Sequence, residues 1–200
     1  EIIKKYGVDS LRYYLIKEVS FGNDGNISED KLENCINSDL ANNFGNLCQR
    51  VISFTDKNLN LKIPSSYKFE NNDLIILDKY KNNFDNLINL IDNQNINEFV
   101  NFIQDQLFAA NKYFNDQEPW KKKENQPRLN TIIYVSLELI RKISILLYPL
   151  IPSTALKVLD IFQIMENDID LNSINNNEFL KKGKTIRKIS ILFKKIEKND

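Results

Sequence analysis

The sequence predicts an all-α protein folded as an antiparallel helix bundle of four to five helices. Apolar residues recur at steps of three and four along most of the chain, which is the spacing of amphipathic helices. Only 5 of the 200 residues are glycine and 5 are proline, and 42% are hydrophobic, so the chain can bury a substantial core. This composition excludes collagen-like, disordered and disulfide-scaffold proteins.

The amino-terminal part predicts one helical region followed by a long helix. Apolar residues between positions 2 and 19 outline the first region, and the turn-forming run FGNDGN at 21–26 ends it. Ser28 is the expected N-cap of the next helix, because Glu29 and Asp30 then offset the positive end of its dipole. From Leu32 to Phe54 the apolar residues form one buried stripe.

Three more helices are predicted after a connection at 59–72. Residues 74–91 describe the second bundle helix and residues 96–114 the third. We expect residues 115–119 to break the third helix, because the residue before Pro119 is pushed out of the helical region. The fourth helix begins near Pro127, ends before Pro149 and is apolar on most sides, which predicts a central position.

The remaining chain predicts a short helix and a tail. Ser153 is the expected N-cap of a fifth helix that contains Leu156 and Phe162. Residues 168–177 read as a polar loop, and residues 186–196 as an amphipathic or extended tail.

Charge gives no general sign of nucleic-acid binding, because 27 basic and 27 acidic residues cancel. Locally, residues 179–198 hold eight Lys or Arg and one acid, Glu197. Such runs are usually solvated surface. Only the triplet Lys121, Lys122 and Lys123, which directly follows the single tryptophan, is predicted to contact phosphates.

The sequence offers no catalytic or metal-binding constellation. It contains no histidine and no glycine-rich phosphate loop, and Cys35 and Cys48 form no CxxC motif, so we expect reduced structural thiols and no metal site. The most apolar stretch, 143–152, is far shorter than the roughly 20 residues that span a bilayer. We therefore expect a soluble cytoplasmic protein, with an organelle matrix as the alternative. Because the chain starts inside a helix, we expect it to be part of a longer protein.

Three residues suggest a reader of single-stranded RNA. Asn46 and Arg50 stand four apart in a helical segment, so their side chains leave the same face one turn apart. Trp120 is expected at a helix end. An amide, a guanidinium and an indole can read the polar edge and the flat face of an unstacked base. Spacing alone favours a plainer interpretation, in which Arg50 covers its neighbours, Asn46 bonds to a loop and Trp120 caps the core.

The chain resembles a known family. Residues 6–15 (YGVDSLRYYL), 21–28 (FGNDGNIS) and 37–47 (NSDLANNFGNL) are similar to the carboxy-terminal half of a bacterial or organellar methionyl-tRNA synthetase, a class I enzyme. Pro119-Trp120 falls where the family has its own Pro-Trp element. The segment LFKKI at 192–196 resembles the family's usual ending, although Ile191 stands where the family prefers proline.

This resemblance implies that Asn46, Arg50 and Trp120 recognise the CAU anticodon of initiator and elongator methionine tRNAs. Trp120 would stack on a splayed base, while Asn46 and Arg50 would address the cytosine and its surroundings. Residues 1–28 would be the end of the catalytic half with a stem-contact segment, and residues 29–200 the anticodon-binding bundle with a tail. No membrane and no DNA partner is implied. The family usually carries two acids shortly before Pro-Trp, where this chain has Asn115 and Asp116.

The resemblance also implies a parent enzyme, a methionine–tRNA ligase that acts in translation. Its ATP, used with Mg, and its methionine would bind upstream, because the HIGH and KMSKS motifs of class I enzymes are absent from these residues. This part would carry no catalytic residue and no cofactor, and would be inactive alone. Two alternatives stay open: the anticodon-binding bundle of the valine, isoleucine, leucine or cysteine enzyme, and a helical protein-interaction module without an RNA role.

Overall fold

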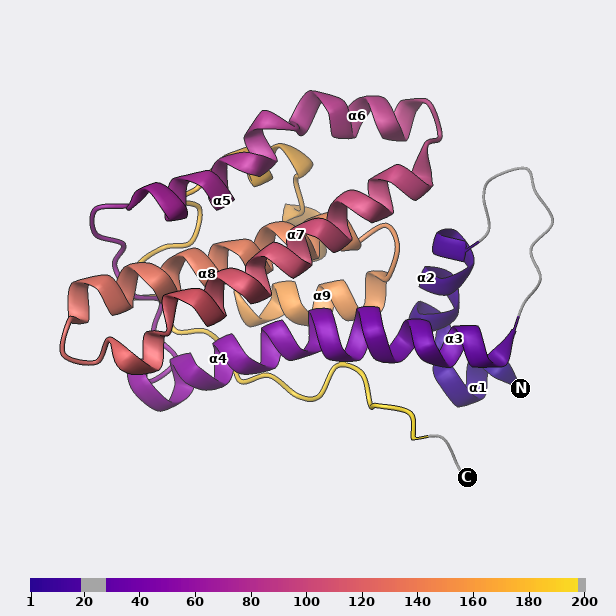
Figure 1. Cartoon of the computed structure of the whole chain (residues 1–200), viewed down its shortest axis with the longest axis horizontal. Helices are drawn as coiled ribbons and strands as arrows, with labels where there is room; N and C mark the ends of the chain where they lie inside the picture. Colours follow the sequence, from indigo (N-terminus) through magenta and orange to yellow (C-terminus); the bar gives the residue numbers. More distant parts are fainter. Residues whose placement is uncertain (19–27, 198–200) are drawn as a thin grey trace.

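The computed structural model describes residues 1–18 and 28–197 (Figure 1). Its α-helices are α1 (Ile2–Tyr6), α2 (Val8–Glu18), α3 (Glu29–Cys35), α4 (Asn46–Leu59), α5 (Asn71–Asn82), α6 (Phe84–Asp92), α7 (Ile96–Gln117), α8 (Gln126–Leu147) and α9 (Pro152–Ile161). A π-helical segment, η1 (Ile36–Gly45), joins α3 to α4, and short 3₁₀ turns are η2 (Pro119–Lys121), η3 (Glu166–Asp168) and η4 (Leu171–Asn175).

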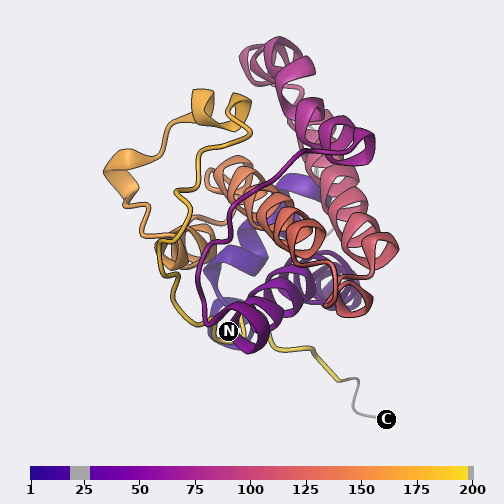
Figure 2. The ribbon, with the colours of Figure 1, turned by 90° about the vertical axis from the view of Figure 1, so that its left-hand side faces the viewer.

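Successive long helices reverse direction, which confirms the predicted all-α bundle. Figure 1 shows α4, then α5 with α6, then α7, α8 and α9 running alternately along the long axis. The end view in Figure 2 shows α8 enclosed by its neighbours, and it contacts α4, α5, α7 and α9. The predicted turn at 21–26 lies outside the described residues.

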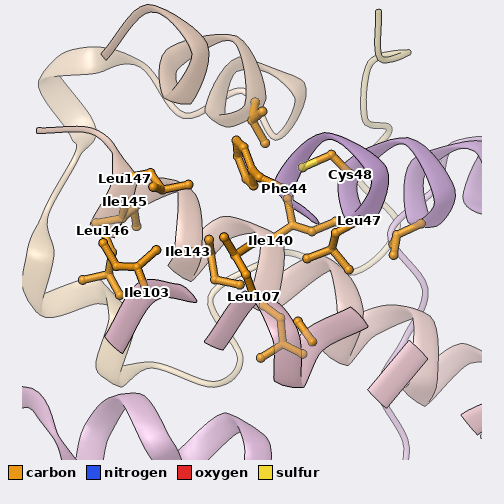
Figure 3. Packing of buried hydrophobic residues seen from close by; sticks show 14 of the residues in the cluster. Phe44, Leu47, Cys48, Ile103, Leu107, Ile140, Ile143, Ile145, Leu146 and Leu147 are labelled. Atoms are coloured by element: carbon orange, nitrogen blue, oxygen red, sulfur yellow. The ribbon is translucent and has the colours of Figure 1, made fainter. Parts of the chain in front are cut away.

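Helix α8 is central because it is apolar on most sides, as predicted. Every residue from position 131 to 147 is buried. Figure 3 shows Leu47 of α4, Leu107 of α7 and Ile140 of α8 within the same core cluster. Three charged residues of α8 lie in this interior. Their hydrogen bonds fix the segment that follows α9 to the core.

The buried charges of α8 are Glu138 and Arg141, which form an ion pair, and Lys142. Arg141 Nε donates to Glu138 Oε2 at 2.7 Å, and neither side chain is exposed. The backbone N–H of Leu180 donates to Glu138 Oε1 at 2.6 Å, while Arg141 Nη2 donates to the backbone carbonyl of Ser173 at 3.1 Å. Residues 173–180 are therefore fixed to the core by paired charges, as buried ions require.

The segment predicted as a polar loop at 168–177 is accordingly more ordered than a loop. It contains the 3₁₀ turn η4, and the side chain of Ile174 is completely buried. Lys142 Nζ donates to the carbonyl of Ile174 at 2.5 Å and to Asn177 Oδ1 at 2.6 Å. The sequence pattern did not reveal this, because the partners lie more than thirty residues apart along the chain.

Two predicted helices are each divided in two. The first region breaks at Gly7, whose φ of +81° ends α1 in a conformation that favours glycine. The second bundle helix breaks at Asn83, where α5 ends and α6 begins. Asn83 Nδ2 donates to the carbonyl of Lys79 at 2.8 Å, a local bond that competes with the helical ladder.

Two predicted helix ends are also corrected. Helix α7 continues to Gln117, and Glu118 ends it as a left-handed C-cap with φ +44°, directly before Pro119, which cannot continue the helix. Helix α9 starts at Pro152, so Ser153 is not its N-cap. Asp9 of α2 serves that end instead, since Asp9 Oδ2 accepts from the Thr154 N–H at 2.6 Å and from Thr154 Oγ1 at 2.7 Å.

The predicted long helix is present from Glu29 to Leu59, with Ser28 at the N-cap position but without a side-chain capping bond. Its middle third is the π-helical η1. The buried residues Leu32, Ile36, Leu40 and Phe44 follow one another at steps of four. Steps of four drift in one direction in an α-helix and in the other in the wider i→i+5 turns, so the combination keeps these residues near one face.

A second polar network fixes the corner between α7 and α8. Arg128 Nη1 donates to Asp73 Oδ2 at 2.5 Å, and Arg128 Nη2 donates to Asp73 Oδ1 at 3.0 Å and to Gln117 Oε1 at 2.6 Å. Tyr113 OH donates to Asp73 Oδ1 at 2.7 Å. Since these residues belong to α5, α7 and α8, the network fixes both ends of the short segment that carries Trp120.

The charge on Asp73 stabilises this corner in a pH-dependent way. Burial favours the neutral acid, but the hydrogen bonds from Arg128 and Tyr113 outweigh it and hold the pKa of Asp73 below its usual 3.8. The pKa of Asp73 is lower in the folded than in the unfolded state. Its contribution to the free energy of unfolding is therefore complete above about pH 4 and is lost as pH falls through the folded-state pKa.

We expect Asp73→Asn to lower the free energy of unfolding by about 3 kcal/mol at pH 7, because it leaves Arg128 without its charge partner. The deficit relative to wild type should shrink as pH is lowered below 3.8. Urea denaturation at several pH values measures both effects. The exposed Asp92 of α6 supplies the control, Asp92→Asn. Equal unfolding free energies for the two variants at pH 7 would contradict the assignment.

Candidate nucleic-acid interface

Arg50 reaches from α4 to the carboxy-terminal end of α7. Its Nη2 donates to Asn115 Oδ1 at 2.5 Å, and its guanidinium carbon lies 5.2 Å from the ring centroid of Phe114. The guanidinium is thus held by one hydrogen bond and one cation–π contact. Arg has five N–H donors, so further donors remain for a ligand.

Trp120 lies in η2, which follows Glu118, the C-cap of α7. Its ring meets Phe114 edge to face, with centroids 6.1 Å apart and planes at 67°, and the preceding Pro119 is buried. Trp120 nevertheless remains 42% exposed. This contradicts a purely core-capping tryptophan and leaves a flat apolar surface open to a ligand.

Arg50, Phe114, Asn115 and Trp120 form one group, the indole cluster. Phe114 is the shared element, because it contacts both the guanidinium and the indole. By apolar spacing, Phe114 is the last residue of the predicted third helix at 96–114, and Asn115 lies in the predicted break at 115–119. Extending α7 by one turn would have set Asn115 on the helix that faces Arg50.

Asn46 shares the helix face of Arg50, as predicted, but not its neighbours. Its exposed side chain lines a groove of about 200 Å³ between the long helix and residues 191–193 of the tail. Among residues 1–18 and 28–197, no partner hydrogen-bonds to its amide, so the bond to a loop backbone considered above is not found. Arg50, by contrast, contacts the ring of Phe114, which in turn contacts Trp120.

The lysines after Trp120 are all exposed. Lys121 Nζ pairs with Glu118 Oε1 at 2.7 Å, whereas no ion pair in the described part of the chain involves Lys122 or Lys123. Asp116, the second of the two residues at the family's acidic positions, pairs with Lys112 at 2.5 Å. Two cations therefore lie next to the indole cluster without an acidic partner.

The two cysteines are buried and free. Burial, together with the nearby charge of Asp39, raises the pKa of Cys35 to about 12, so its thiol is protonated at neutral pH. The described ranges, 1–18 and 28–197, contain no cluster of His, Cys, Asp and Glu suited to a metal ion. Within those same ranges, no helix has the length and apolar character needed to cross a membrane.

Comparison with protein families gives two matches that follow one another along the chain. Residues 63–200 match the family described as the anticodon binding domain of methionyl tRNA ligase. Residues 1–52 match the family described as class I tRNA synthetases (M). The first match alone covers more than half of the chain.

Individual relatives agree with these families. The chain is 38% identical over 165 residues to a methionine–tRNA ligase of Brucella suis, a match that covers 82% of the chain. It is 36% identical over 200 residues to that of Thermotoga maritima, covering 99%. The matched region is 32% of the length of each relative, so the chain spans about a third of them.

Solved structures agree as well. The free methionyl-tRNA synthetase of Mycobacterium tuberculosis superimposes with a TM-score of 0.92 at 30% identity, over 99% of this chain and 40% of that one. The same enzyme in complex with methionyl-adenylate gives 0.90 at 31% identity, over 96% of this chain and 38% of that one. Together with the two family matches, these likenesses show that the chain belongs to the methionyl-tRNA synthetase family and contains its anticodon-binding domain.

Proposed function

We propose that this chain reads the CAU anticodon of methionine tRNAs, initiator and elongator alike, for an enzyme that joins methionine to them. The observation that carries the proposal is the indole cluster, in which an exposed tryptophan and a held guanidinium lie on one shared aromatic ring. Such a pair suits an unstacked base, whose face needs an aromatic surface and whose edge needs hydrogen-bond donors.

Each site residue has a distinct role in this proposal. Trp120 stacks on one splayed base, Arg50 donates to an acceptor edge, and Asn46 offers an amide one helical turn away. Base stacking is worth roughly 1–3 kcal/mol, and a good edge contact is of similar size. Lys121, Lys122 and Lys123 contact phosphates beside the stacked base, where they position the RNA without reading its sequence.

The rest of the enzyme belongs to the same proposal. Methionine and ATP with Mg bind in a catalytic domain outside this chain, which itself contributes no catalytic residue. Residues 1–28 complete that domain and contact the tRNA stem, and residues 29–200 form the reader. The tie between α2 and α9 through Asp9 and Thr154 supports a fixed orientation of these parts. The cytoplasm is the proposed compartment, with an organelle matrix as the alternative.

Replacing Trp120 tests the stacking role. In an enzyme that carries this chain and a catalytic domain, Trp120→Ala should reduce the rate of tRNA aminoacylation by tens- to a hundredfold, the loss of about 2–3 kcal/mol of stacking. The rate of methionine activation, measured by pyrophosphate exchange, should not change. Met165→Ala, which truncates another exposed hydrophobic side chain, is the control. A normal aminoacylation rate in Trp120→Ala would exclude Trp120 as the stacking residue.

Replacing Arg50 tests the edge contact. Arg50→Lys keeps the charge but loses the planar fork, so the preference for CAU over an altered first anticodon base should fall about tenfold. The ratio of kcat/KM for the two tRNAs measures this preference. Arg187, an exposed arginine paired with Asp160, provides the matched control Arg187→Lys, which should retain full selectivity. Equal selectivity in both variants would exclude Arg50 from base reading.

A further inference from the structure

A cavity of about 470 Å³ lies beside the segment that follows α9. Its lining comes from three stretches of the chain, namely Ile63, residues 162–168 and residues 176–184. Figure 2 shows the last two stretches, in light orange to yellow, across α8 from α7. This cavity, the α9 pocket, shares no residue with the indole cluster, so the proposed anticodon reader does not use it.

The interior of the α9 pocket is apolar. Ile63, Phe162 and Leu180 line it with side chains that are buried in the core. The ring of Phe179 adds an aromatic wall, and the guanidinium carbon of Arg141 lies 4.4 Å from the centroid of this ring. An aromatic ring beside buried apolar side chains stabilises an apolar group that covers them, because apolar surface is removed from water.

The walls of the pocket are fixed by hydrogen bonds within the chain. The Glu138–Arg141 ion pair of α8 binds the backbone at positions 180 and 176, with distances of 2.6 and 3.0 Å. On the opposite side, Ile63 forms two backbone hydrogen bonds with the turn at 181–184, at 2.8 and 2.9 Å. The pocket therefore keeps its shape without a ligand, as small-molecule sites usually do.

Three lysines lie in one turn at the edge of the pocket. Residues 181–184 are Lys-Lys-Gly-Lys, with Gly183 at φ +78°, and the three lysines are exposed. Lys181 and Lys184 line the pocket, whereas Lys182 does not. No ion pair among residues 1–18 and 28–197 involves any of the three. The lining also includes one acid, Asp168, so two lysines and one carboxylate give it a net charge of +1.

We propose that the α9 pocket binds a small apolar monocarboxylate, such as an aromatic acid, with its ring against Phe179 and its carboxylate on Lys181 and Lys184. A monoanion matches the net charge of the lining, and an apolar body matches its buried side chains. The cavity volume lies within the range of about 300–1,000 Å³ that is typical of small-molecule sites. This inference goes beyond the proposed function and does not depend on it.

The arrangement favours a small acid over an RNA phosphate. A phosphate is strongly hydrated and gains nothing from apolar walls. Phosphate contacts at the surface would also involve all three lysines of the turn alike, since such contacts follow the local density of positive charge. Only a ligand inside the pocket distinguishes Lys181 and Lys184 from Lys182.

Three probes test the two parts of the proposed ligand separately. The first, 2-naphthoate, has an aromatic body and a carboxylate, whereas 2-naphthylmethanol has only the aromatic body and acetate only the carboxylate. Calorimetric titration of this chain at about 0.15 M salt measures their affinities, because charges more than roughly 8 Å apart are then largely screened. Naphthoate should bind about tenfold more tightly than naphthylmethanol, and acetate should not bind measurably.

Naphthoate should also shift the backbone amide signals of residues 162–168 and 176–184 in nuclear magnetic resonance spectra, which locates it in the α9 pocket. Absence of naphthoate binding, or equal affinities for naphthoate and naphthylmethanol, would overturn the proposal. Amide shifts confined to other residues would overturn it as well.

The turn itself offers a matched set of variants. Lys181→Gln and Lys184→Gln should each weaken naphthoate binding about threefold, the value of one exposed charge contact. Lys182→Gln removes the same charge from the same turn but outside the pocket, and should bind naphthoate as wild type does. An equal loss in all three variants would make the turn a general anion-binding surface and would contradict a ligand inside the pocket.

Competition with RNA supplies the last comparison. A hairpin with a CAU loop, added in excess, should leave naphthoate binding unchanged, because the α9 pocket and the indole cluster share no residue. Displacement of naphthoate by the hairpin would assign the lysines to phosphate contacts and overturn the small-acid site. Quenching of Trp120 by the same hairpin is measured separately, so the pocket and the proposed function can each fail without the other.

Discussion

The ion pair between Glu138 and Arg141 inside α8 is the interaction on which the arrangement of the other elements depends. Burying two charges costs several kcal/mol each unless their remaining hydrogen-bonding positions are filled. In this fold the filling groups come from the backbone of residues 173–180. The segment after α9 is therefore required by the core, although its sequence is mostly polar.

That requirement extends to both sides of the candidate site. Once residues 173–180 are fixed, the chain continues into the bridge between Lys62 and Thr185 and from there into the tail along α4. On the other side, Asp73 and Arg128 fix the corner that carries Trp120. The face of α4 with Asn46 and Arg50 thus lies between the tail, which Asn37 ties to the long helix through Ile196, and the corner that Asp73 and Arg128 fix.

How much of the fold and of the candidate site could be predicted from the sequence depended on how far apart along the chain the contacting residues lie. The long helix, α7 and α8 follow from apolar spacing within single segments, and so does the shared face of Asn46 and Arg50. Asp9 at the start of α9, Asn115 beside Arg50 and the tail beside Asn46 each depend on a partner 65 to 147 residues away. No periodicity encodes such pairs. The resemblance to a family named the candidate site residues but not their neighbours.

The zero net charge of the chain is consistent with a reader that contributes selectivity more than affinity. Affinity for nucleic acid comes mainly from phosphate contacts by cations, whereas base contacts distinguish one sequence from another. In the proposed interface Arg50, Lys122 and Lys123 are cations with no ion pair among residues 1–18 and 28–197, while the amide of Asn46 and the indole of Trp120 are neutral. Under the proposed function, another part of the enzyme holds the tRNA body. The rigid core of the bundle then keeps Arg50 and Trp120 at a fixed separation.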